Sequence, residues 1–231
     1  MLELSRVNTF LGKSHILHNV DMIVEEGTIH AVLGRNGVGK TTLLNCILGL
    51  TNSSQGSMKL EGMEIIDIPT YQRARSGVAT VPQGRQIFSD FSVRDNILMG
   101  GFAHPNRKRQ IPQIVHQLFP YLSDNMNRPG GLLSGGQQQQ LAIARALASA
   151  PKLLLMDEPT EGIQPNIVEQ IQDTIIRLNG EFGITIVLVE QNVNFARRAA
   201  KNFSIFEKGR PVAGGSCRSL TAELVQKHLT V

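Results

Sequence analysis

The sequence contains no tryptophan, only two cysteines and few aromatic residues, which make up 5% of its 231 positions. Cys46 and Cys217 show neither metal-ligand nor redox spacing, and this usage is typical of a reducing compartment. We expect Cys46 to lie in the core. The length allows one large domain, or one domain with an inserted subdomain, and an ample core.

Long apolar runs are also missing. The best of them, residues 184–189, is strand-sized and far below the roughly 18 residues that a membrane-spanning helix needs. Residues 1–6 lack the apolar region of a signal peptide. We therefore expect a cytosolic chain that only a partner brings to a membrane.

The chain also lacks a large excess of charge of either sign. Its net charge of +4 is too small to favour nucleic acid as a partner. The dense basic run Arg107, Lys108 and Arg109 is expected to be a solvated loop rather than a binding patch. The histidines lack ligand spacing and are expected to be structural or exposed; they are His15, His18, His30, His104, His116 and His228.

The chain does contain a phosphate-binding pattern, G-x-x-x-x-G-K-[ST], between a predicted buried strand (28–33) and a predicted helix (40–49). Glycines there let successive N–H groups turn inward around polyphosphate oxygens, and the helix offers its positive N-terminal end. Lys40 adds a charge for the β- and γ-phosphates, and the Thr41 hydroxyl is a ligand for Mg²⁺. The candidate nucleotide-binding residues are Gly34, Arg35, Asn36, Gly37, Val38, Gly39, Lys40, Thr41 and Thr42.

Apolar periodicity predicts an α/β nucleotide-binding core with a parallel sheet. The predicted strands are residues 2–8, 20–24, 28–33, 56–62, 78–81, 153–156, 184–189 and 203–206, and the predicted helices outside residues 92–150 are 40–49, 71–76, 167–178, 193–200 and 220–229. Residues 92–150 are almost wholly helical in pattern, so we expect them to form an inserted helical subdomain. Ligand should bind at the carboxyl ends of the strands.

Two further segments suit the same ligand. Asp157 and Glu158 follow a buried strand; Asp157 would lie near Mg²⁺ at Thr41, and Glu158 could polarise a water aimed at the γ-phosphate. The alternative is a strand whose acidic end simply meets solvent. Residues 133–137 open a helix with Ser134 as its N-cap and glycines behind it, which indicates either a second anion site or an ordinary capped helix.

Together these motifs, with Gln83 after a strand and Pro159 and Thr160 after Glu158, occur in the order seen in ATP-binding subunits of ABC transporters, which the chain resembles over essentially its whole length. The resemblance implies a P-loop NTPase fold of the ABC type, with an antiparallel β subdomain and an inserted α-helical subdomain. One ABC ATPase domain (1–231) would then comprise a RecA-like core plus β subdomain (1–91 and 151–231) and a helical subdomain with the signature motif (92–150).

The resemblance also implies roles. Residues 34–42 would be the Walker A loop, Gln83 the Q-loop residue that senses Mg²⁺ and the membrane partner, Asp157 the Walker B aspartate and Glu158 the catalytic carboxylate. The signature residues, which complete the ATP site of a facing subunit, would be Ser134, Gly135, Gly136 and Gln137. ATP and Mg²⁺ would be the cofactors, and two ATP molecules between two subunits would drive alternating access in two transmembrane permeases. The subunit would lie on the cytoplasmic face of the inner membrane as a peripheral protein.

Three positions depart from the family pattern. Gln191 stands where a histidine is usual; it can hydrogen-bond the γ-phosphate but takes no proton, so Glu158 should carry more of the catalysis, with Lys40 beside it. Gln164 stands at a usual aspartate. Leu11 occupies the place of the adenine-stacking aromatic, and the adjacent Phe10 is either its substitute or a core residue.

Glu190, Gln191 and Asn192 resemble the branched-chain amino acid importer group, and residues 81–85, 136–141 and 159–165 look most like its urea-importer ATPase. That likeness implies a second, non-identical ATPase, two permeases and an extracytoplasmic binding protein; whether the isolated chain forms a homodimer stays open. Branched-chain amino acids or short-chain amides are the alternative solutes. A soluble ABC ATPase of cofactor assembly is a further alternative, and a plain P-loop switch or kinase would leave residues 133–137 unexplained.

Overall fold

The computed structural model describes residues 1–51, 53–104, 106 and 110–229, and the basic run Arg107, Lys108 and Arg109 lies outside them. The strands are β1 (Leu2–Leu11), β2 (Ser14–Val24), β3 (Ile29–Leu33), β4 (Ser53–Leu60), β5 (Met63–Glu64), β6 (Val78–Val81), β7 (Leu153–Asp157), β8 (Thr185–Glu190), β9 (Asn202–Glu207) and β10 (Arg210–Ser216). The α-helices are α1 (Lys40–Leu48), α2 (Thr70–Arg75), α3 (Val93–Gly100), α4 (Gln113–Leu118), α5 (Pro120–Asp124), α6 (Gly135–Leu147), α7 (Pro165–Gly180), α8 (Val193–Ala199) and α9 (Ala222–His228).

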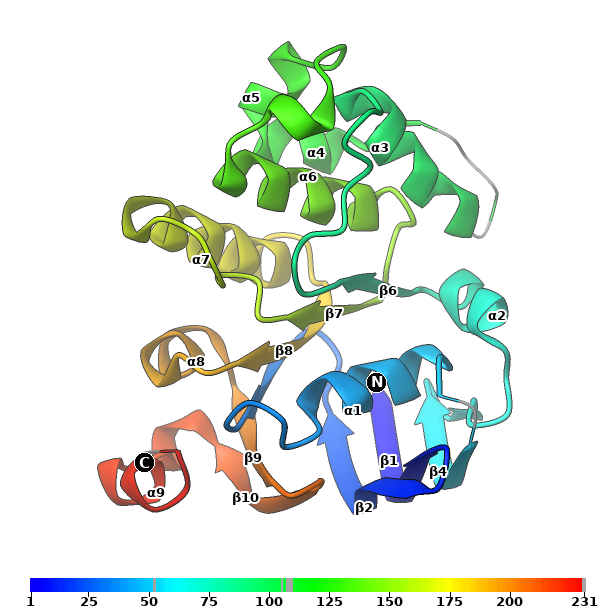
Figure 1. The fold of residues 1–231 in the computed structure, drawn as a ribbon, viewed down its shortest axis with the longest axis vertical. Helices are drawn as coiled ribbons and strands as arrows, with labels where there is room; N and C mark the ends of the chain where they lie inside the picture. Colours follow the sequence, from blue (N-terminus) through cyan, green and yellow to red (C-terminus); the bar gives the residue numbers. More distant parts are fainter. Residues whose placement is uncertain (52, 105, 107–109, 230–231) are drawn as a thin grey trace.

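The larger sheet has the strand order β10-β9-β3-β8-β7-β6, and all neighbours in it are parallel except β10 and β9. The predicted parallel sheet is therefore confirmed. Its central strands are buried along their whole length, because helices cover one face while α1 and the smaller sheet cover the other (Figure 1). The carboxyl ends of β3, β7 and β8 meet at one edge, where Leu33 pairs with Glu190 and Asp157 with Val189.

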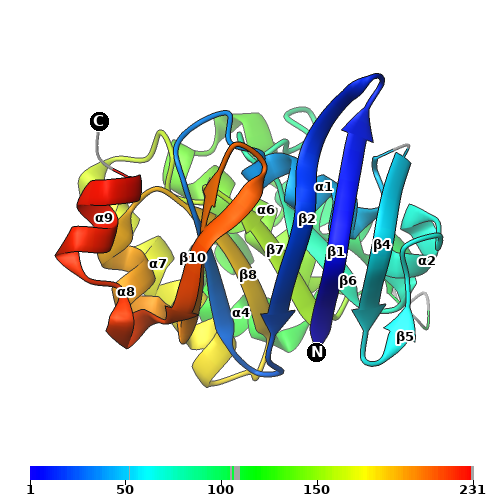
Figure 2. The same cartoon turned by 90° about the horizontal axis from the view of Figure 1, so that it is seen from below.

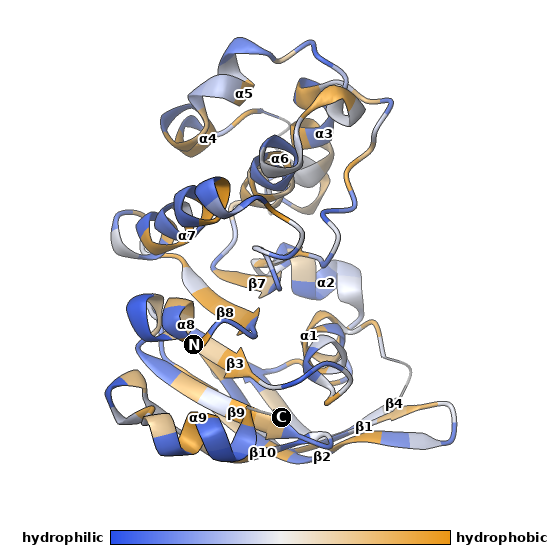
Figure 3. Cartoon of the chain, turned by 60° about the vertical axis from the view of Figure 1, so that its left-hand side comes forward, coloured by the Kyte–Doolittle hydropathy of each residue, from blue (hydrophilic) through white to orange (hydrophobic). Residues whose placement is uncertain are grey.

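Side-chain alternation along the strands divides the interior into two cores. On β7, Leu154 and Met156 pack among the helices of residues 93–225, whereas Leu153 and Leu155 pack toward α1 and the smaller sheet. Cys46 belongs to the second core with 1% of its surface exposed, as expected. In Figure 3 the central strands are accordingly apolar, while the outer helices turn hydrophilic faces to solvent.

The smaller sheet is antiparallel, with the order β2-β1-β4-β5. Strands β1 and β2 are longer than the predicted 2–8 and 20–24, because pairing continues up to the turn at Gly12 and brings Leu11 opposite Ser14. Strand β10, which the sequence did not predict because of Pro211 and its glycines, runs beside β2 when the molecule is seen from below (Figure 2).

The helices α3 to α6 gather at the end of the molecule opposite the smaller sheet (Figure 1). Their region is less continuously helical than predicted, since turns and short 3-10 segments separate the helices. One buried amide, that of Asn96, holds the connection into this region: it donates to the carbonyls of Phe88, Phe91 and Ser92 and accepts from the Phe88 N–H. The boundaries proposed for the two subdomains stay a prediction.

Candidate nucleotide-binding site

The phosphate loop joins β3 to α1 as the motif predicts. Gly39 precedes the first helical residue with a φ of 105°, a left-handed conformation that favours glycine, and an added Cβ would lie 3.2 Å from a methyl carbon of Leu17. The loop therefore turns tightly against β2, and the first N–H groups of α1 follow directly after it.

A turn far away in the sequence fastens this loop. The Gly209 N–H donates to the Val38 carbonyl (2.8 Å), and the Gly209 carbonyl accepts from the His18 N–H (2.8 Å). Gly209 has a φ of 78°, and a Cβ there would lie 1.7 Å from the Ile16 carbonyl oxygen, so only glycine fits. The β9–β10 turn thus connects the phosphate loop to the smaller sheet.

Lys40, at the start of α1, is buried with 4% of its surface exposed. Its Nζ donates to the carbonyls of Gly34 (2.7 Å) and Arg35 (2.9 Å) and lies 3.3 Å from Glu158 Oε1. All three partners are protein oxygens, so a phosphate group that reaches Lys40 has to replace at least one of them.

A second set of contacts lies next to the Lys40 side chain and joins Glu158, Gln191 and Asn36. The Gln191 Nε2 donates to Glu158 Oε2 (2.8 Å) and to Asn36 Oδ1 (2.8 Å). The backbone of Glu158 is left-handed, with a φ of 45°, and its N–H donates to the Val189 carbonyl (3.0 Å). Such a conformation is uncommon for a non-glycine residue and is characteristic of functional sites, where the surrounding structure maintains it. The structure therefore brings Lys40, Glu158 and Gln191 together.

Asp157 ends β7 and is buried, with 4% of its surface exposed. Burial raises the pKa of its carboxyl group, while a hydrogen bond with Thr41 and the charge of Lys40 act in the opposite direction. Its Oδ1 has no hydrogen-bond partner among the described residues. A buried carboxylate oxygen without a partner, beside a threonine hydroxyl, matches the hard oxygen ligands that Mg²⁺ takes, so these residues fit that ion.

Gln83 lies in the loop after β6, and its Nε2 donates to Glu161 Oε2 (2.8 Å). Glu161 follows Asp157 by four residues, and its charge adds to the rise in the pKa of the Asp157 carboxyl group, so this hydrogen bond joins the loop after β6 to the segment behind that carboxylate. Arg85, two residues on, donates to the Gly162 carbonyl (3.1 Å) and to Gln138 Oε1 on α6 (3.4 Å). The loop after β6 is thus bonded both to the segment after β7 and to α6.

Ser134 is the N-cap of α6, as predicted. Its Oγ accepts from the Gln137 N–H (3.4 Å), and Gln137 Oε1 accepts from the Ser134 N–H (2.9 Å), which completes a capping box. Gly136 has no room for a side chain, since a Cβ would lie 2.4 Å from a methyl carbon of Ile167 on α7. The first turn of α6 is therefore capped and closely packed, and Ser134 is exposed at the end of the helix.

At the tip of the smaller sheet, Leu11 is 49% exposed and Phe10 is partly buried. The Phe10 ring stacks on His15 with 4.3 Å between centroids, and the His18 ring lies 3.9 Å from His15. Ile16, between these histidines, lies near Gly39 of the phosphate loop. The aromatic surface beside the loop therefore consists of Phe10 and His15, and the contribution of His15 was not predicted.

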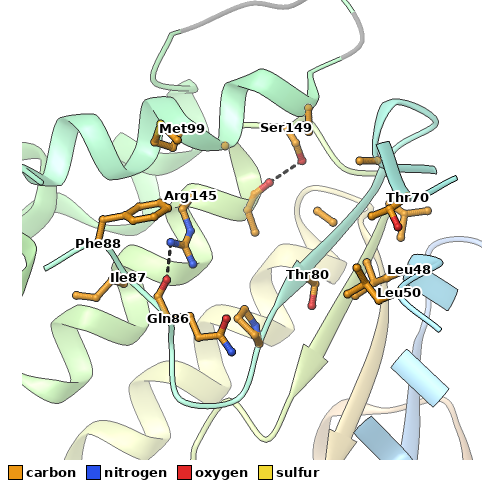
Figure 4. A pocket seen from close by; sticks show the side chains of 17 residues that line it. Leu48, Leu50, Thr70, Thr80, Gln86, Ile87, Phe88, Met99, Arg145 and Ser149 are labelled. Carbon is orange, nitrogen blue, oxygen red and sulfur yellow. Dashed lines mark hydrogen bonds between the residues drawn. The ribbon is translucent and has the colours of Figure 1, made fainter. Parts of the chain in front are cut away.

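A groove of about 670 Å³ opens beside the loop after β6 (Figure 4). Apolar side chains line much of it: Leu48 and Leu50 at the end of α1, and Phe88 and Met99 from the helical end. Arg145 of α6 crosses its wall, donates to the Gln86 carbonyl (2.7 Å) and lies 5.4 Å from the centre of the Phe88 ring. The groove thus shares residues with the segment that carries Gln83.

Comparison with known proteins decides the family. A family model described as ABC transporter matches residues 17–161, more than half of the chain. The chain belongs to the ABC transporter family. The high-affinity branched-chain amino acid transport ATP-binding protein BraG of Pseudomonas aeruginosa is 42% identical over 213 residues, 92% of this chain and 91% of BraG. The probable branched-chain amino acid transport ATP-binding protein LivF of Archaeoglobus fulgidus is 35% identical over 223 residues, which are 95% of this chain and 94% of LivF.

Solved structures agree with the fold of this ABC subunit. A nucleotide-free ATP-binding cassette from an ABC transporter aligns with a TM-score of 0.83 and 25% identity over 100% of this chain and 95% of that one. A dimeric cassette in a post-hydrolysis state, bound to ADP and Pi, aligns with a TM-score of 0.80 and 25% identity. The alignment covers 95% of this chain and 100% of that one. This chain is therefore an ATP-binding, ATP-hydrolysing subunit of the ABC type with the nucleotide-binding domain fold that its motifs predicted.

Two kinds of feature are absent from the described part of this ABC subunit. Among the residues that the structure describes, no helix is both long and apolar enough to cross a bilayer. The same part of the chain has no group of three or more His, Cys, Asp or Glu side chains arranged to hold a metal ion.

Proposed function

We propose that this ABC ATPase powers an importer, and that its ATP sites are completed only when two ATPase subunits face each other. The observation that carries the proposal is that the two candidate phosphate-binding segments of one chain bond to different partners. Lys40 and Gln191 both contact Glu158 at the sheet edge, whereas Ser134 is exposed at the N-terminus of α6. Each ATP would be held by residues 34–42 of one subunit and by Ser134, Gly135, Gly136 and Gln137 of the other.

In this proposal Glu158 accepts the proton of the attacking water. Lys40 contacts the β- and γ-phosphates once ATP replaces its protein partners, and Gln191 donates to the γ-phosphate while keeping Glu158 oriented. Because the Gln191 amide cannot accept a proton, Glu158 is the sole base of the set.

Asp157, Thr41 and Gln83 would hold Mg²⁺. The ion, when bound, neutralises charge on the phosphates. The side chain of Gln83 suits this role because Glu161, as a carboxylate, accepts from its Nε2 and leaves its carbonyl oxygen free as a ligand.

The groove beside Gln86 and Phe88 would receive a helical segment of a membrane permease (Figure 4). Its apolar walls suit the apolar face of a short amphipathic helix. Through Arg145, Gln86 and Arg85 the groove is bonded to the segment after β7 and to α6, so occupation of the groove would reach both halves of the ATP site. The subunit would then lie at the cytoplasmic membrane face, beside two permeases and a second, non-identical ATPase, with an extracytoplasmic binding protein supplying solute.

For the solute we propose urea, on the likeness of residues 81–85, 136–141 and 159–165 to the urea-importer ATPase. The second candidate is branched-chain amino acids, which the names of BraG and LivF favour. The test is uptake of labelled urea and labelled leucine by cells that carry the wild-type chain or its Glu158→Gln variant. Loss of urea uptake alone supports the first candidate, loss of leucine uptake alone supports the second, and loss of neither overturns both candidate solutes.

A further inference from the structure

A buried carboxylate that the proposed chemistry does not use lies directly behind the site. Glu190 ends β8 with 3% of its surface exposed, and burial raises the pKa of its carboxyl group. Glu158 is the nearby charged side chain, and its charge acts in the same direction. Among the residues that the structure describes, no lysine or arginine offsets this cost, and the interactions that stabilise the charged group are hydrogen bonds.

Those hydrogen bonds join two loops. The Oε1 of Glu190 accepts from the Thr160 hydroxyl (2.8 Å), in the segment after β7. Its Oε2 accepts from the N–H groups of Gln191 (3.2 Å) and Asn192 (3.4 Å), in the segment after β8. Thr160 follows Glu158 by two residues, so the carboxylate of Glu190 links a side chain of the segment that carries Glu158 to the backbone of the segment that carries Gln191.

Gln191 is thereby fixed at both ends. Glu190 holds its N–H, while its Nε2 bonds to Glu158 Oε2 and Asn36 Oδ1. The next residue, Asn192, is the N-cap of α8 and accepts from the Phe195 N–H (3.0 Å), so the segment has little freedom on its far side. A shift of the segment after β8 would carry the Gln191 amide away from Glu158.

We propose that Glu190 is a positioning residue for ATP hydrolysis, which through its hydrogen bonds holds Gln191, and with it Glu158, in the arrangement that attacks the γ-phosphate. The inference rests on the proposed roles of Glu158 and Gln191. It assigns Glu190 no contact with ATP and no proton transfer.

The chain offers a matched pair of variants. In Glu190→Gln the amide oxygen still accepts from both N–H groups, and the amide nitrogen donates to the Thr160 hydroxyl, which then acts as acceptor. All bonds persist and only the charge is lost. In Glu190→Ala the bonds are lost. We expect Glu190→Gln to keep kcat within about twofold of wild type and Glu190→Ala to lower it about tenfold, with the affinity for a non-hydrolysable ATP analogue unchanged in both.

A double-mutant cycle separates positioning from general damage. In the Gln191→Ala background, Glu190→Ala should have little further effect on kcat, because the side chain that it positions is already missing. Thr160→Val, which keeps the shape and removes one donor, should lower kcat about threefold, and Thr160→Ser should restore it. The Thr160→Val variant tests the positioning role of Glu190 even if Glu190→Ala fails to fold.

The inference is overturned if Thr160→Val or Glu190→Ala leaves kcat unchanged, if the Glu190 and Gln191 effects simply multiply, or if kcat and analogue affinity fall together. Glu190→Gln losing as much turnover as Glu190→Ala would show that the charge matters rather than the bonds. Failure of the proposed function is a different result, namely full turnover in Glu158→Gln.

Discussion

The carboxyl ends of β3, β7 and β8 and the N-terminus of α6 both carry segments expected to meet ATP, but their side chains are bonded differently. At the strand ends, contacts link Lys40 to Glu158, Glu158 to Gln191 and Gln191 to Asn36, across three segments of the chain. At α6, the signature side chains bond within their own first turn. Hydrogen bonds between side chains of distant segments hold chemical groups at fixed positions. A helix end that is capped within its own first turn instead leaves its remaining N–H groups to face outward.

The largest test of this difference is Glu158→Gln. Loss of the only base should slow hydrolysis by about 10²–10⁴-fold while ATP binding persists, and nucleotide should trap a closed dimer on gel filtration. Glu181→Gln is the matched control, since it removes an exposed carboxylate that pairs with Arg177 and has no proposed part in the ATP site. Undiminished turnover in Glu158→Gln would remove the chemical role from the strand ends.

The second test addresses α6. Ser134→Arg should lower turnover by about 10²-fold or more, because a bulky cation blocks the segment offered to the facing subunit. ATP binding by the isolated chain should stay the same, measured by titration calorimetry. Ser92→Arg removes the N-cap of another helix, α3, and should cost similar stability without that loss of turnover. Lost ATP binding by the Ser134→Arg monomer would contradict an outward-facing role.

The third test stays within the strand ends. Gln191→Ala should slow hydrolysis about tenfold, less than Glu158→Gln, because glutamine orients the base without accepting a proton. Single-turnover rates at saturating ATP measure this order directly. The reverse order would mean that Gln191, rather than Glu158, limits the chemistry.

The smallest expected effect is on stability. The pKa values of Asp157 and Glu190 are raised by burial, so the folded state holds these protons more tightly than the unfolded state. Their contribution is most favourable below the ordinary carboxyl pKa and is lost as the pH rises toward the raised values. Glu190→Gln should therefore raise the thermal midpoint more at pH 8 than at pH 4.5, whereas Ser134→Ala should cost ~1 kcal/mol at both. Equal shifts at both pH values for Glu190→Gln would refute this distinction.

Short-range patterns predicted much of this molecule. The phosphate loop, the carboxylates after β7 and the N-cap of α6 each occupy a few consecutive residues, and periodicity predicted the parallel strands. Strand β10 was missed because proline and glycine are poor strand formers, and its partner β9 lies outside the short pattern that could be examined locally.

Contacts between residues that are far apart in the sequence could not be predicted from such short patterns. Gln191 meets Asn36 across 155 positions, and Arg85 meets Gly162 across 77. Glu190 had a signal that went unused: like Asp157, it is a carboxylate at the end of an apolar strand, and that placement alone could have marked it.

The bond between the Gly209 N–H and the Val38 carbonyl bears on how the protein is made. When a nascent chain has emerged from the ribosome only as far as its phosphate loop, the β9–β10 turn that fastens this loop to the smaller sheet has not yet been synthesised. Nucleotide capture should therefore begin only after most of the polypeptide has been synthesised, and truncation before Gly209 should yield chains that fail to retain ATP although they carry the complete motif.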